Sequence, residues 1–387
     1  MMLLTHNFLG YFYIEKNIYI DIYENIKGVY MDYRILAINP GSTSTKISIY
    51  DNEYPVFIKS ITHKSEEINK YKDINEQYTM RKNVILKELE DNNIDINSIN
   101  VIVARGGLLP PIKSGAYLIN EEMIDRLKNR PVIEHVSNLA AIIAYEIGQL
   151  INIKSYIYDS VSVDEFTDIS RISGLKGMDR ICVGHTLNCR ATAIKYSNSI
   201  NKEYKDLNLI VAHLGGGITI QLHEKGRIVD IVADDEGPFS SNRTGRLPLK
   251  NVINECFSGK YTQKDINNLI RGRGGIFSYL NTTDIREVEK MIENGNSYAK
   301  LIYEAFAYQI SKGIGELATV VNGNVDAIIL TGGVSYSKVA TNIINKRVNF
   351  IGKVEIMPGE NELEALTLGV LRVLKNKEKA HIYKESI

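Results

Sequence analysis

Apolar and polar residues alternate along two stretches of the chain, residues 34–50 and 209–223. In each stretch two apolar segments flank a short turn of small or hydroxyl-bearing residues, which predicts a β-hairpin. A third apolar run, residues 326–331, ends at Gly332 and Gly333. Turns of this kind leave backbone amides unpaired at a strand end, where they can bind the oxygens of a phosphate chain. The pattern therefore predicts three candidate phosphate-binding turns.

Helical and extended segments alternate through the rest of the chain, which predicts an α/β fold. The predicted helices cover residues 65–97, 121–130, 135–153, 185–196, 297–321 and 362–376, with one more starting at residue 287. Further strands are predicted over residues 99–107, 155–159, 227–234 and 327–330. Residues 234–249 follow no regular pattern and contain two glycines, two prolines and two arginines. A loop of this length is more often functional than idle.

The repeated hairpin predicts two related domains side by side, with a cleft between them. A length of 387 residues also exceeds what one hydrophobic core usually organises. The expected division gives a first domain of residues 33–160 plus 363–387 and a second of residues 161–362. Residues 1–30 are aromatic and isoleucine-rich but interrupted by charges, and they precede Met31. We expect them to be an extension from an upstream start, without a catalytic role and poorly ordered.

Composition excludes several partners. Lysine plus arginine and aspartate plus glutamate both number 46, so no net charge favours nucleic acid or an anionic membrane. No run approaches the roughly 20 apolar residues of a membrane span. Three scattered cysteines suit a reducing cytoplasm better than a disulfide framework or a zinc site. We therefore expect a soluble cytoplasmic protein with a small-molecule partner.

The first two turns carry the candidate phosphate contacts. Asn39, Ser42, Ser44 and Lys46 belong to the first turn, and Gly215–Gly217 form the second. Each turn alone has an ordinary interpretation, because such residues favour turns anyway. The matching pair favours nucleotide binding, although the P-loop and the Gly-x-Gly-x-x-Gly fingerprints are absent.

Charged residues follow the predicted strands. Arg105 and Asp159 each end a strand, where side chains of α/β proteins reach the cleft. Arg243 and Arg246 lie in the long loop, and either can supply a fork for a carboxylate or a phosphoryl group. His185 starts a predicted helix. By itself it is more simply interpreted as a hydrogen-bonded core histidine.

Seven ordered motifs give a more specific picture. They are INPGSTSTK, ARGGLLPPIKSGAYLIN, HVSNL, YDSVSVDEF, HLGGGITI, DDEGPFS and NTTDIRE. From about residue 31 to the end, the chain resembles the butyrate kinases and branched-chain carboxylate kinases of the acetate kinase family. The resemblance implies two ribonuclease-H-like domains of the actin, heat-shock-chaperone and sugar-kinase type, which flank a nucleotide cleft. This agrees with the twin hairpins.

The resemblance also implies roles for residues. Arg105 and Arg243 would hold the carboxylate and the phosphoryl group, Asp159 would be the active-site carboxylate, and His185 would stabilise the transition state. The implied contacts to ATP or ADP are Asn39, Ser42, Ser44, Lys46, His213, Gly215, Gly216, Gly217, Asp284, Arg286, Gly332 and Gly333. Asn39 and Glu362 would lie near Mg²⁺, with Glu364 a competing choice.

The implied activity is the reversible, ATP-dependent phosphorylation of butyrate, isobutyrate or another short carboxylate to its acyl phosphate, by a homo-oligomer. Run backwards, the reaction would make ATP from butyryl phosphate.

Acetate kinases carry a Phe where this chain has Gly184, so we expect a roomier pocket that prefers butyrate to acetate. The alternative for Gly184 is a turn with positive φ. Acetate kinases also have a longer segment after the residue that matches Arg105. The roles of their pocket residues in that segment therefore cannot be assigned to residues of this chain. The alternatives for function are an acetate or propionate kinase and, from another class, a non-catalytic ATP-binding module.

Overall fold

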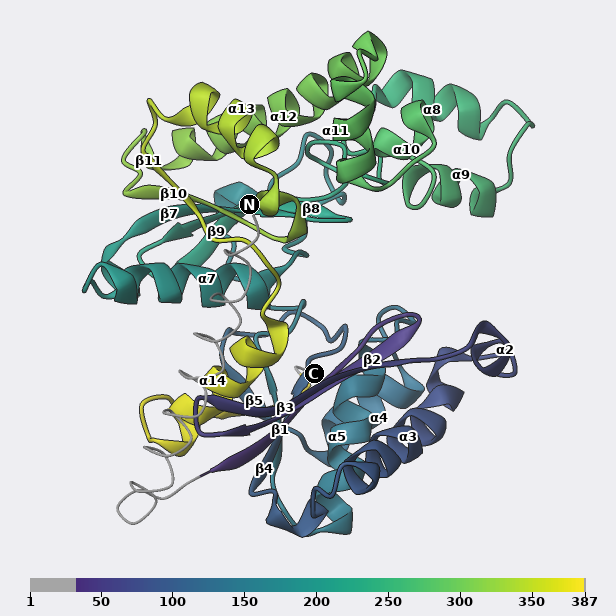
Figure 1. The fold of residues 1–387 in the computed structure, drawn as a ribbon, viewed down its shortest axis with the longest axis vertical. Helices are drawn as coiled ribbons and strands as arrows, with labels where there is room; N and C mark the ends of the chain where they lie inside the picture. The colour runs from purple at the N-terminus through teal and green to yellow at the C-terminus, as the bar shows by residue number, and fades with distance from the viewer. Residues whose placement is uncertain (1–32, 386–387) are drawn as a thin grey trace, which may run out of the picture.

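The computed structural model describes residues 33–385, which form two α/β units, one above the other in Figure 1. The prediction for residues 1–30 lies outside the described residues. The strands of the first sheet are β1 (Arg34–Pro40), β2 (Ser44–Asp51), β3 (Tyr54–Thr62), β4 (Val101–Arg105), β5 (Ala116–Leu118), β6 (Ser155–Tyr158) and β12 (His381–Ile382). Those of the second sheet are β7 (Asn208–Leu214), β8 (Ile218–Glu224), β9 (Arg227–Val232), β10 (Ala327–Thr331) and β11 (Lys353–Ile356).

The two sheets share one strand order. In the first, β1, β2 and β3 form an antiparallel meander, and β4 and then β6 lie parallel to β1 on its other side. In the second, β7, β8 and β9 form the meander, and β10 and then β11 lie parallel to β7. The first sheet is extended by β5 and β12. The repeated order confirms the predicted pair of related α/β domains.

Helices cover both faces of each sheet. The helices of the first unit are α2 (Ser65–Ile68), α3 (Tyr78–Asp91), α4 (Glu121–Asn129) and α5 (Asn138–Leu150), together with the last helix of the chain, α14 (Glu362–Leu374). Between β6 and β11 lie α6 (Asp168–Arg171), α7 (Thr186–Ser199), α8 (Leu249–Cys256), α9 (Gln263–Ile270), α10 (Gly275–Leu280), α11 (Ile285–Glu293), α12 (Ser297–Ala318) and α13 (Lys338–Val348). The short 3₁₀ turns are η1 (Ile74–Gln77), η2 (Ile96–Ser98), η3 (Tyr204–Asp206), η4 (Thr319–Val321) and η5 (Gly333–Tyr336).

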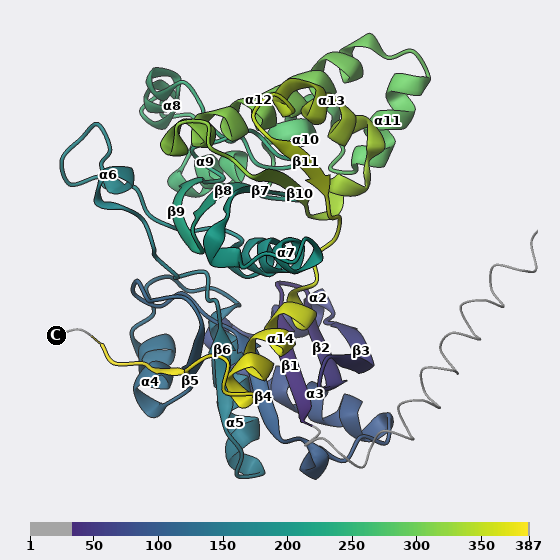
Figure 2. The same cartoon turned by 90° about the vertical axis from the view of Figure 1, so that its left-hand side faces the viewer.

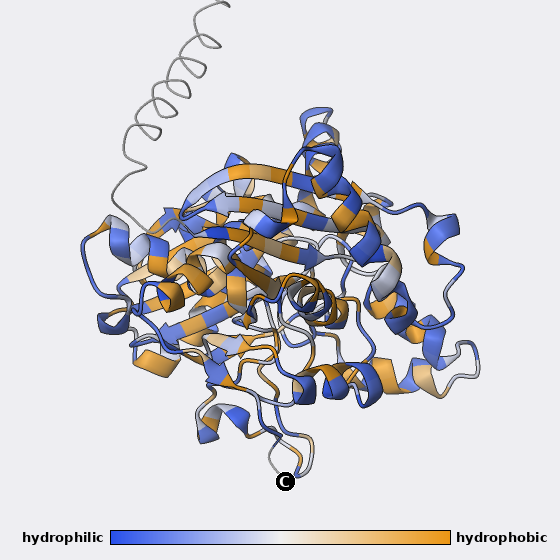
Figure 3. Cartoon of the chain, turned by 90° about the horizontal axis from the view of Figure 1, so that it is seen from below, coloured by the Kyte–Doolittle hydropathy of each residue, from blue (hydrophilic) through white to orange (hydrophobic). Residues whose placement is uncertain are grey.

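Burial on both faces explains why the central strands are apolar throughout. In β1, Leu36 and Ile38 pack in the cluster that contains α5, whereas Ile35 and Ala37 pack in the cluster that contains α14. Successive residues of a strand point to opposite faces, so a strand covered on both sides reads as a continuous apolar run. Figure 3 shows hydrophobic residues gathered in the interior elements and hydrophilic residues over the outer loops.

The last helix belongs to the first unit. Helix α14 packs against β1, β4 and β6, and it also contacts α7 of the second unit, which faces it in Figure 2. The chain therefore passes from the first unit to the second after β6 and returns before α14. We propose on this basis the domain division expected from the sequence, at residues 160 and 362.

One predicted helix differs from the structure, and the edge strand β3 was not predicted. The helix expected over residues 65–97 is divided into α2, η1 and α3, because Asp73 caps a new turn by accepting from the Asn75 amide at 2.6 Å. Strand β3 has a mostly exposed burial pattern, so alternation did not reveal this edge strand. Among residues 33–385, every helix is too short or too polar to span a lipid bilayer.

One buried histidine makes stability depend on pH. His223 on β8 is fully buried, and its Nδ1 accepts from the Tyr204 hydroxyl at 2.6 Å while its Nε2 donates to Gln221 Oε1 at 3.2 Å. Burial, and then the charge of Arg190, hold the pKa of His223 well below its usual value of 6.5. The folded protein therefore keeps this ring neutral where the unfolded chain protonates it.

We predict that stability falls as the pH drops below about 6.5, by up to ~1.4 kcal/mol per pH unit for this proton, and that His223 contributes nothing to the slope above that pH. Urea unfolding at pH 7.5 and pH 5.5 measures the change. His223→Gln lowers stability at both pH values but should reduce the difference between them by the share of this one proton. An unchanged difference in the variant would assign the acid sensitivity to other groups.

Candidate active site

The first predicted turn joins β1 to β2, and its end is closed by a hydrogen bond from the Gly41 amide to Ser44 O at 2.7 Å. Ser42 is exposed and Ser44 is partly exposed. Asn39 is buried, and its Oδ1 has no hydrogen-bond partner within residues 33–385. Buried polar atoms are nearly always paired. An unpaired amide oxygen beside an exposed turn is therefore a candidate ligand atom.

Glu362 connects this turn to the end of β4. Its carboxylate accepts from Asn39 Nδ2 and pairs with Arg105 Nη1 at 2.9 Å. It starts α14, where the helix dipole favours a negative charge. Glu364 instead lies 4.0 Å from Lys195 Nζ. The geometry thus favours Glu362 over Glu364 as the carboxylate beside the first turn.

Two glycines set the path of the chain after Arg105. A Cβ at Gly106 would lie 2.4 Å from the Ser160 side chain, and a Cβ at Gly107 would lie 2.7 Å from Asn138 Oδ1. Only glycine allows backbones to approach this closely. The chain after Arg105 therefore passes close to the start of α5 and the end of β6.

The second turn joins β7 to β8, and the Gly215 amide donates to Gly217 O at 3.2 Å. Gly216 faces open space among the described residues, while a Cβ at Gly217 would lie 2.6 Å from Arg243 Nη1. Ser240 supports the turn, because its hydroxyl donates to Gly216 O at 2.6 Å. The guanidinium of Arg243 therefore lies directly over the second turn.

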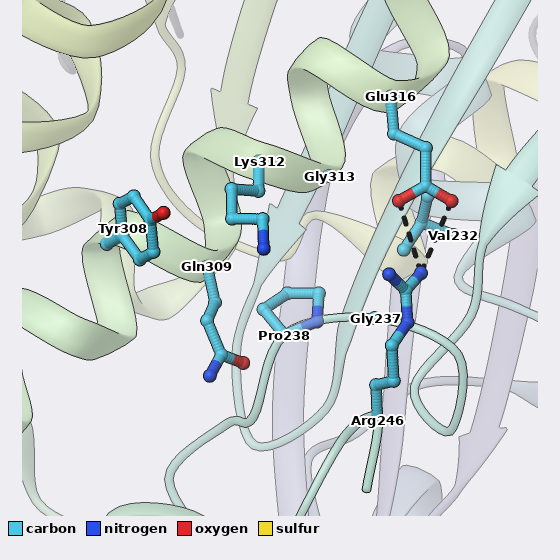
Figure 4. Close-up of a pocket in the computed structure, with 9 residues that line it drawn as sticks. All are labelled: Val232, Gly237, Pro238, Arg246, Tyr308, Gln309, Lys312, Gly313 and Glu316. Carbon is cyan, nitrogen blue, oxygen red and sulfur yellow. Dashed lines mark hydrogen bonds and ion pairs between the residues drawn. The ribbon is translucent and has the colours of Figure 1, made fainter. Parts of the chain in front are cut away.

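Asp234 fixes that guanidinium. Its carboxylate pairs with Arg243 Nη1 and, through its other oxygen, with Arg271 Nη2 at 3.0 Å. Arg246 points elsewhere. Figure 4 shows it toward Glu316, at 3.1 Å, in a separate surface pocket of about 160 Å³. Of the two loop arginines, Arg243 is the one beside the second turn.

Two stacked histidines lie next to these arginines. The rings of His185, at the start of α7, and His213, on β7, are parallel with centroids 3.9 Å apart. His185 Nδ1 bonds to Thr219 Oγ1 at 2.9 Å. Asn188 Nδ2 lies 2.9 Å from His213 Nδ1, which leaves His213 Nε2 to donate to Glu360 at 3.2 Å.

Burial and the charges nearby favour a neutral His185. Its pKa lies well below 6.5 because of burial first, and then because of His213, Arg105 and Arg243. In the tautomer whose Nδ1 accepts from the Thr219 hydroxyl, the ring proton is on Nε2, which is then a donor. We refer to Arg105, Arg243, His185 and His213 as the arginine–histidine cluster.

The interpretation of Gly184 as an empty pocket is wrong. A Cβ at this position would lie 2.5 Å from Thr219 Cγ2 and 3.3 Å from Gln221 Nε2, so that space is occupied by β8. Gly184 is also not among the glycines with positive φ, which removes the alternative based on a turn. The small residue lets the backbone approach β8 closely, and this brings His185 within reach of the Thr219 hydroxyl.

Asp159 has a different environment from the cluster. It is buried, pairs with Arg190 Nε at 3.4 Å and accepts from the Gly115 amide at 2.9 Å. Arg190 lies on α7 and also pairs with Glu165 at 2.5 Å. The arginine that Asp159 contacts is thus neither Arg105 nor Arg243. The pair of Asp159 with Arg190 joins the end of β6 in the first unit to α7.

The remaining predicted contacts lie in the second unit, except for Lys46. Asp284 caps α11 and pairs with the exposed Arg286 at 2.6 Å, and hydrogen bonds from Arg286 lower the pKa of Asp284 to about 2. Gly332, with φ of 88°, passes so close to Leu214 that a Cβ would lie 2.5 Å from its carbonyl oxygen. Gly333 faces open space, and Lys46 is exposed on β2. Their roles toward a nucleotide stay predictions.

Sequence reasoning missed His135, which precedes α5. Its Nδ1 bonds to Ser137 Oγ at 2.8 Å. Its pKa is lowered by burial and then by Arg105, Arg271 and Arg243, so it lies near the same charges as His185. The motif HVSNL contained it, but only the packing of α5 beside β4 shows where it lies.

Two sheets of one strand order, each with an open turn after its first strand, define a protein of the sugar-kinase and actin fold type. The chain belongs to the acetokinase family. The model of that family matches residues 185–370. Butyrate kinase 1 of Clostridium acetobutylicum is 49% identical over 354 residues, which cover 91% of this chain and 100% of the relative.

Solved structures of low sequence identity share the fold. The acetate kinase of Porphyromonas gingivalis superposes with a TM-score of 0.74 at 18% identity, over 87% of this chain and 99% of that chain. A propionate kinase from Francisella tularensis gives a TM-score of 0.69 at 16% identity, over 87% and 98%. These matches agree with the two-domain architecture described above.

We predict that Gly184→Ala destabilises the protein by about 1–3 kcal/mol, because the new methyl group overpacks against Thr219. Thr219→Ser removes the clashing methyl group and keeps the hydroxyl. The double variant should therefore be more stable than the sum of the two single effects, by more than ~0.5 kcal/mol. Urea unfolding of the four proteins measures this coupling, and additive effects would show that the contact is relieved in another way.

Proposed function

We propose that this chain is a carboxylate kinase that transfers the γ-phosphoryl group of ATP to butyrate, and to related short or branched acids, with Mg²⁺. The proposal rests chiefly on the arginine–histidine cluster, which lies between the first and second turns. The butyrate kinase that is 49% identical to this chain, and that is covered over its full length, supports the choice of substrate. The acetate and propionate kinases are only 16–18% identical and support the fold alone.

Phosphoryl transfer needs positioning and charge neutralisation more than covalent chemistry. A carboxylate oxygen would attack the γ-phosphorus, and the bond to the bridging oxygen would break, with its electron pair leaving on ADP. The products are an acyl phosphate and ADP. No proton moves, because a carboxylate is already ionised at neutral pH. The same site would make ATP from an acyl phosphate in the reverse direction.

Each member of the cluster has a role in this step. Arg105 and Arg243 supply planar forks for the carboxylate and the phosphoryl oxygens. Asp234 and Glu362 hold these forks in place. Neutral His185 offers its Nε2–H to a non-bridging oxygen where negative charge concentrates.

The residues at the first turn fit Mg²⁺. Asn39 Oδ1 is buried without a partner within the described chain, and the Glu362 carboxylate lies beside it. Magnesium in kinases is bound by one or two protein oxygens together with substrate phosphates and water. When bound, the ion would neutralise charge on the phosphates of the nucleotide.

We further propose a homo-oligomer that works in the cytoplasm. Leu249, Ile253 and Phe257 are 73%, 47% and 87% exposed, and their spacing of four residues forms one stripe along α8 and the residue that follows it. Such a stripe suits contact with a second copy. The three cysteines are free thiols, which suits a reducing compartment.

Hydroxylamine trapping tests the activity directly. The full chain is incubated with ATP, Mg²⁺ and butyrate, isobutyrate, propionate or acetate, and acyl hydroxamate is measured. We expect product from butyrate at a higher kcat/KM than from acetate. A higher value for acetate or propionate would change the substrate within the family. ATP binding without product from any of these acids would instead support the non-catalytic module.

We predict that Arg243→Ala lowers kcat by ~10²-fold or more, because it removes a fixed charge donor from the transition state. Arg246→Ala is the matched control, since this arginine of the same loop pairs with Glu316 in the outer pocket. The control should keep kcat within a few-fold of the wild type. Equal losses in the two variants would mean that the loop responds as a whole and that Arg243 has no separate role.

A further inference from the structure

Arg81 on α3 is completely buried, and none of the described carboxylates lies within ion-pair distance of it. A buried charge is costly unless it is paired or fully hydrogen-bonded. The proposed mechanism gives Arg81 no part, and nothing in its sequence context distinguished it.

The hydrogen bonds of this side chain go to the first turn, to Thr45 at its end and to Gln77. Nη1 donates to Gly41 O at 2.9 Å and to Ser44 O at 3.2 Å, and Nη2 donates to Ser42 O at 3.1 Å. The Gln77 side chain accepts from Nε at 3.2 Å and from Nη2 at 3.0 Å. One guanidinium therefore binds three carbonyl oxygens of a turn only a few residues long.

This arrangement decides which groups the turn presents outward. Its carbonyl oxygens point back toward Arg81, so Ser42 and Thr43, which are exposed, offer hydroxyl groups on the outer face. Carbonyl oxygens would repel a phosphate, whereas hydroxyl and amide donors attract one. The guanidinium thus holds the turn in the form that an anion requires.

A second contact supports the same turn from the side of β3. Arg81 Nη1 donates to Thr45 Oγ1 at 3.1 Å, and the same oxygen is hydrogen-bonded to His63 Nε2, 2.8 Å away. The His63 amide donates to Thr43 O at 2.9 Å. Burial, and then the charge of Arg81, lower the pKa of His63, so Arg81 is the cation beneath the turn.

We propose that Arg81 is a positioning residue for nucleotide binding. It fixes the first turn from behind, and its charge, which lacks a protein carboxylate, is compensated by the phosphates of the bound nucleotide. This inference rests on the proposed function, in which the first turn binds ATP.

Gln77→Glu tests the charge without removing a hydrogen-bond acceptor. The new carboxylate would neutralise Arg81 where Gln77 now bonds to it. A merely structural arginine should gain stability from this ion pair, with unchanged nucleotide affinity. Our proposal expects the gain in thermal stability together with a KM for ATP about tenfold higher, and a KM for butyrate within twofold.

Arg81→Lys tests the geometry, because an ammonium group keeps the charge but cannot reach the same set of acceptors. We expect a KM for ATP at least about tenfold higher. Arg372→Lys is the control, as a half-buried arginine at the far end of α14 that pairs with Glu378 at 3.3 Å. It should lose stability without a change in KM for ATP.

Calorimetric titration with Mg²⁺-ATP and ADP separates this inference from the activity. If the wild type binds nucleotide but makes no acyl phosphate, weaker binding by Gln77→Glu and Arg81→Lys still supports the role of Arg81. Unchanged nucleotide affinity in Gln77→Glu and in a folded Arg81→Lys would overturn it. If Arg81→Lys does not fold, the result of Gln77→Glu decides alone.

Discussion

The contact of Glu362 with Asn39 and Arg105 joins the start of the last helix to the ends of two central strands. It forms where the chain returns from the second unit to the first, so it fixes the position of α14 on the first sheet. Helix α14 also packs against α7, which begins after His185. The relation between Arg105 and His185 therefore depends on this carboxylate together with the packing of α14 and the pair of Asp159 with Arg190.

Arginine and carboxylate side chains are paired around the two turns. Arg105 pairs with Glu362, Arg243 and Arg271 share the carboxylate of Asp234, and Glu360 accepts from His213. Burial, and then the same arginines, hold the pKa of His185 and His135 below the usual value. The arginines are thus the cations that can meet an anion here, and the histidines act as hydrogen-bonding groups.

The sequence predicts the fold well, because hairpins, helices and the repeated turn all depend on local patterns. It also identifies the strand ends and loop residues of the site. It could not choose between Arg243 and Arg246, three residues apart in one loop, because that choice depends on whether Asp234 or Glu316 accepts the side chain. The interpretation of Gly184 failed for a similar reason, since the residue that fills its space, Thr219, is 35 positions later. Tertiary contacts decide such questions, and alternation along the chain carries no information on them.

The two turns are equivalent in the repeated fold but are supported in opposite ways. Behind the first turn, Arg81 is buried and binds its carbonyl oxygens. At the second, Ser240 holds Gly216 O, and Arg243 lies over Gly217 on a partly exposed side. A cation beneath a turn can only strengthen the binding of an anion, whereas a cation above it can touch the anion directly. This difference suits a division of roles in which the first turn holds the nucleotide and the arginine of the second meets the group that is transferred.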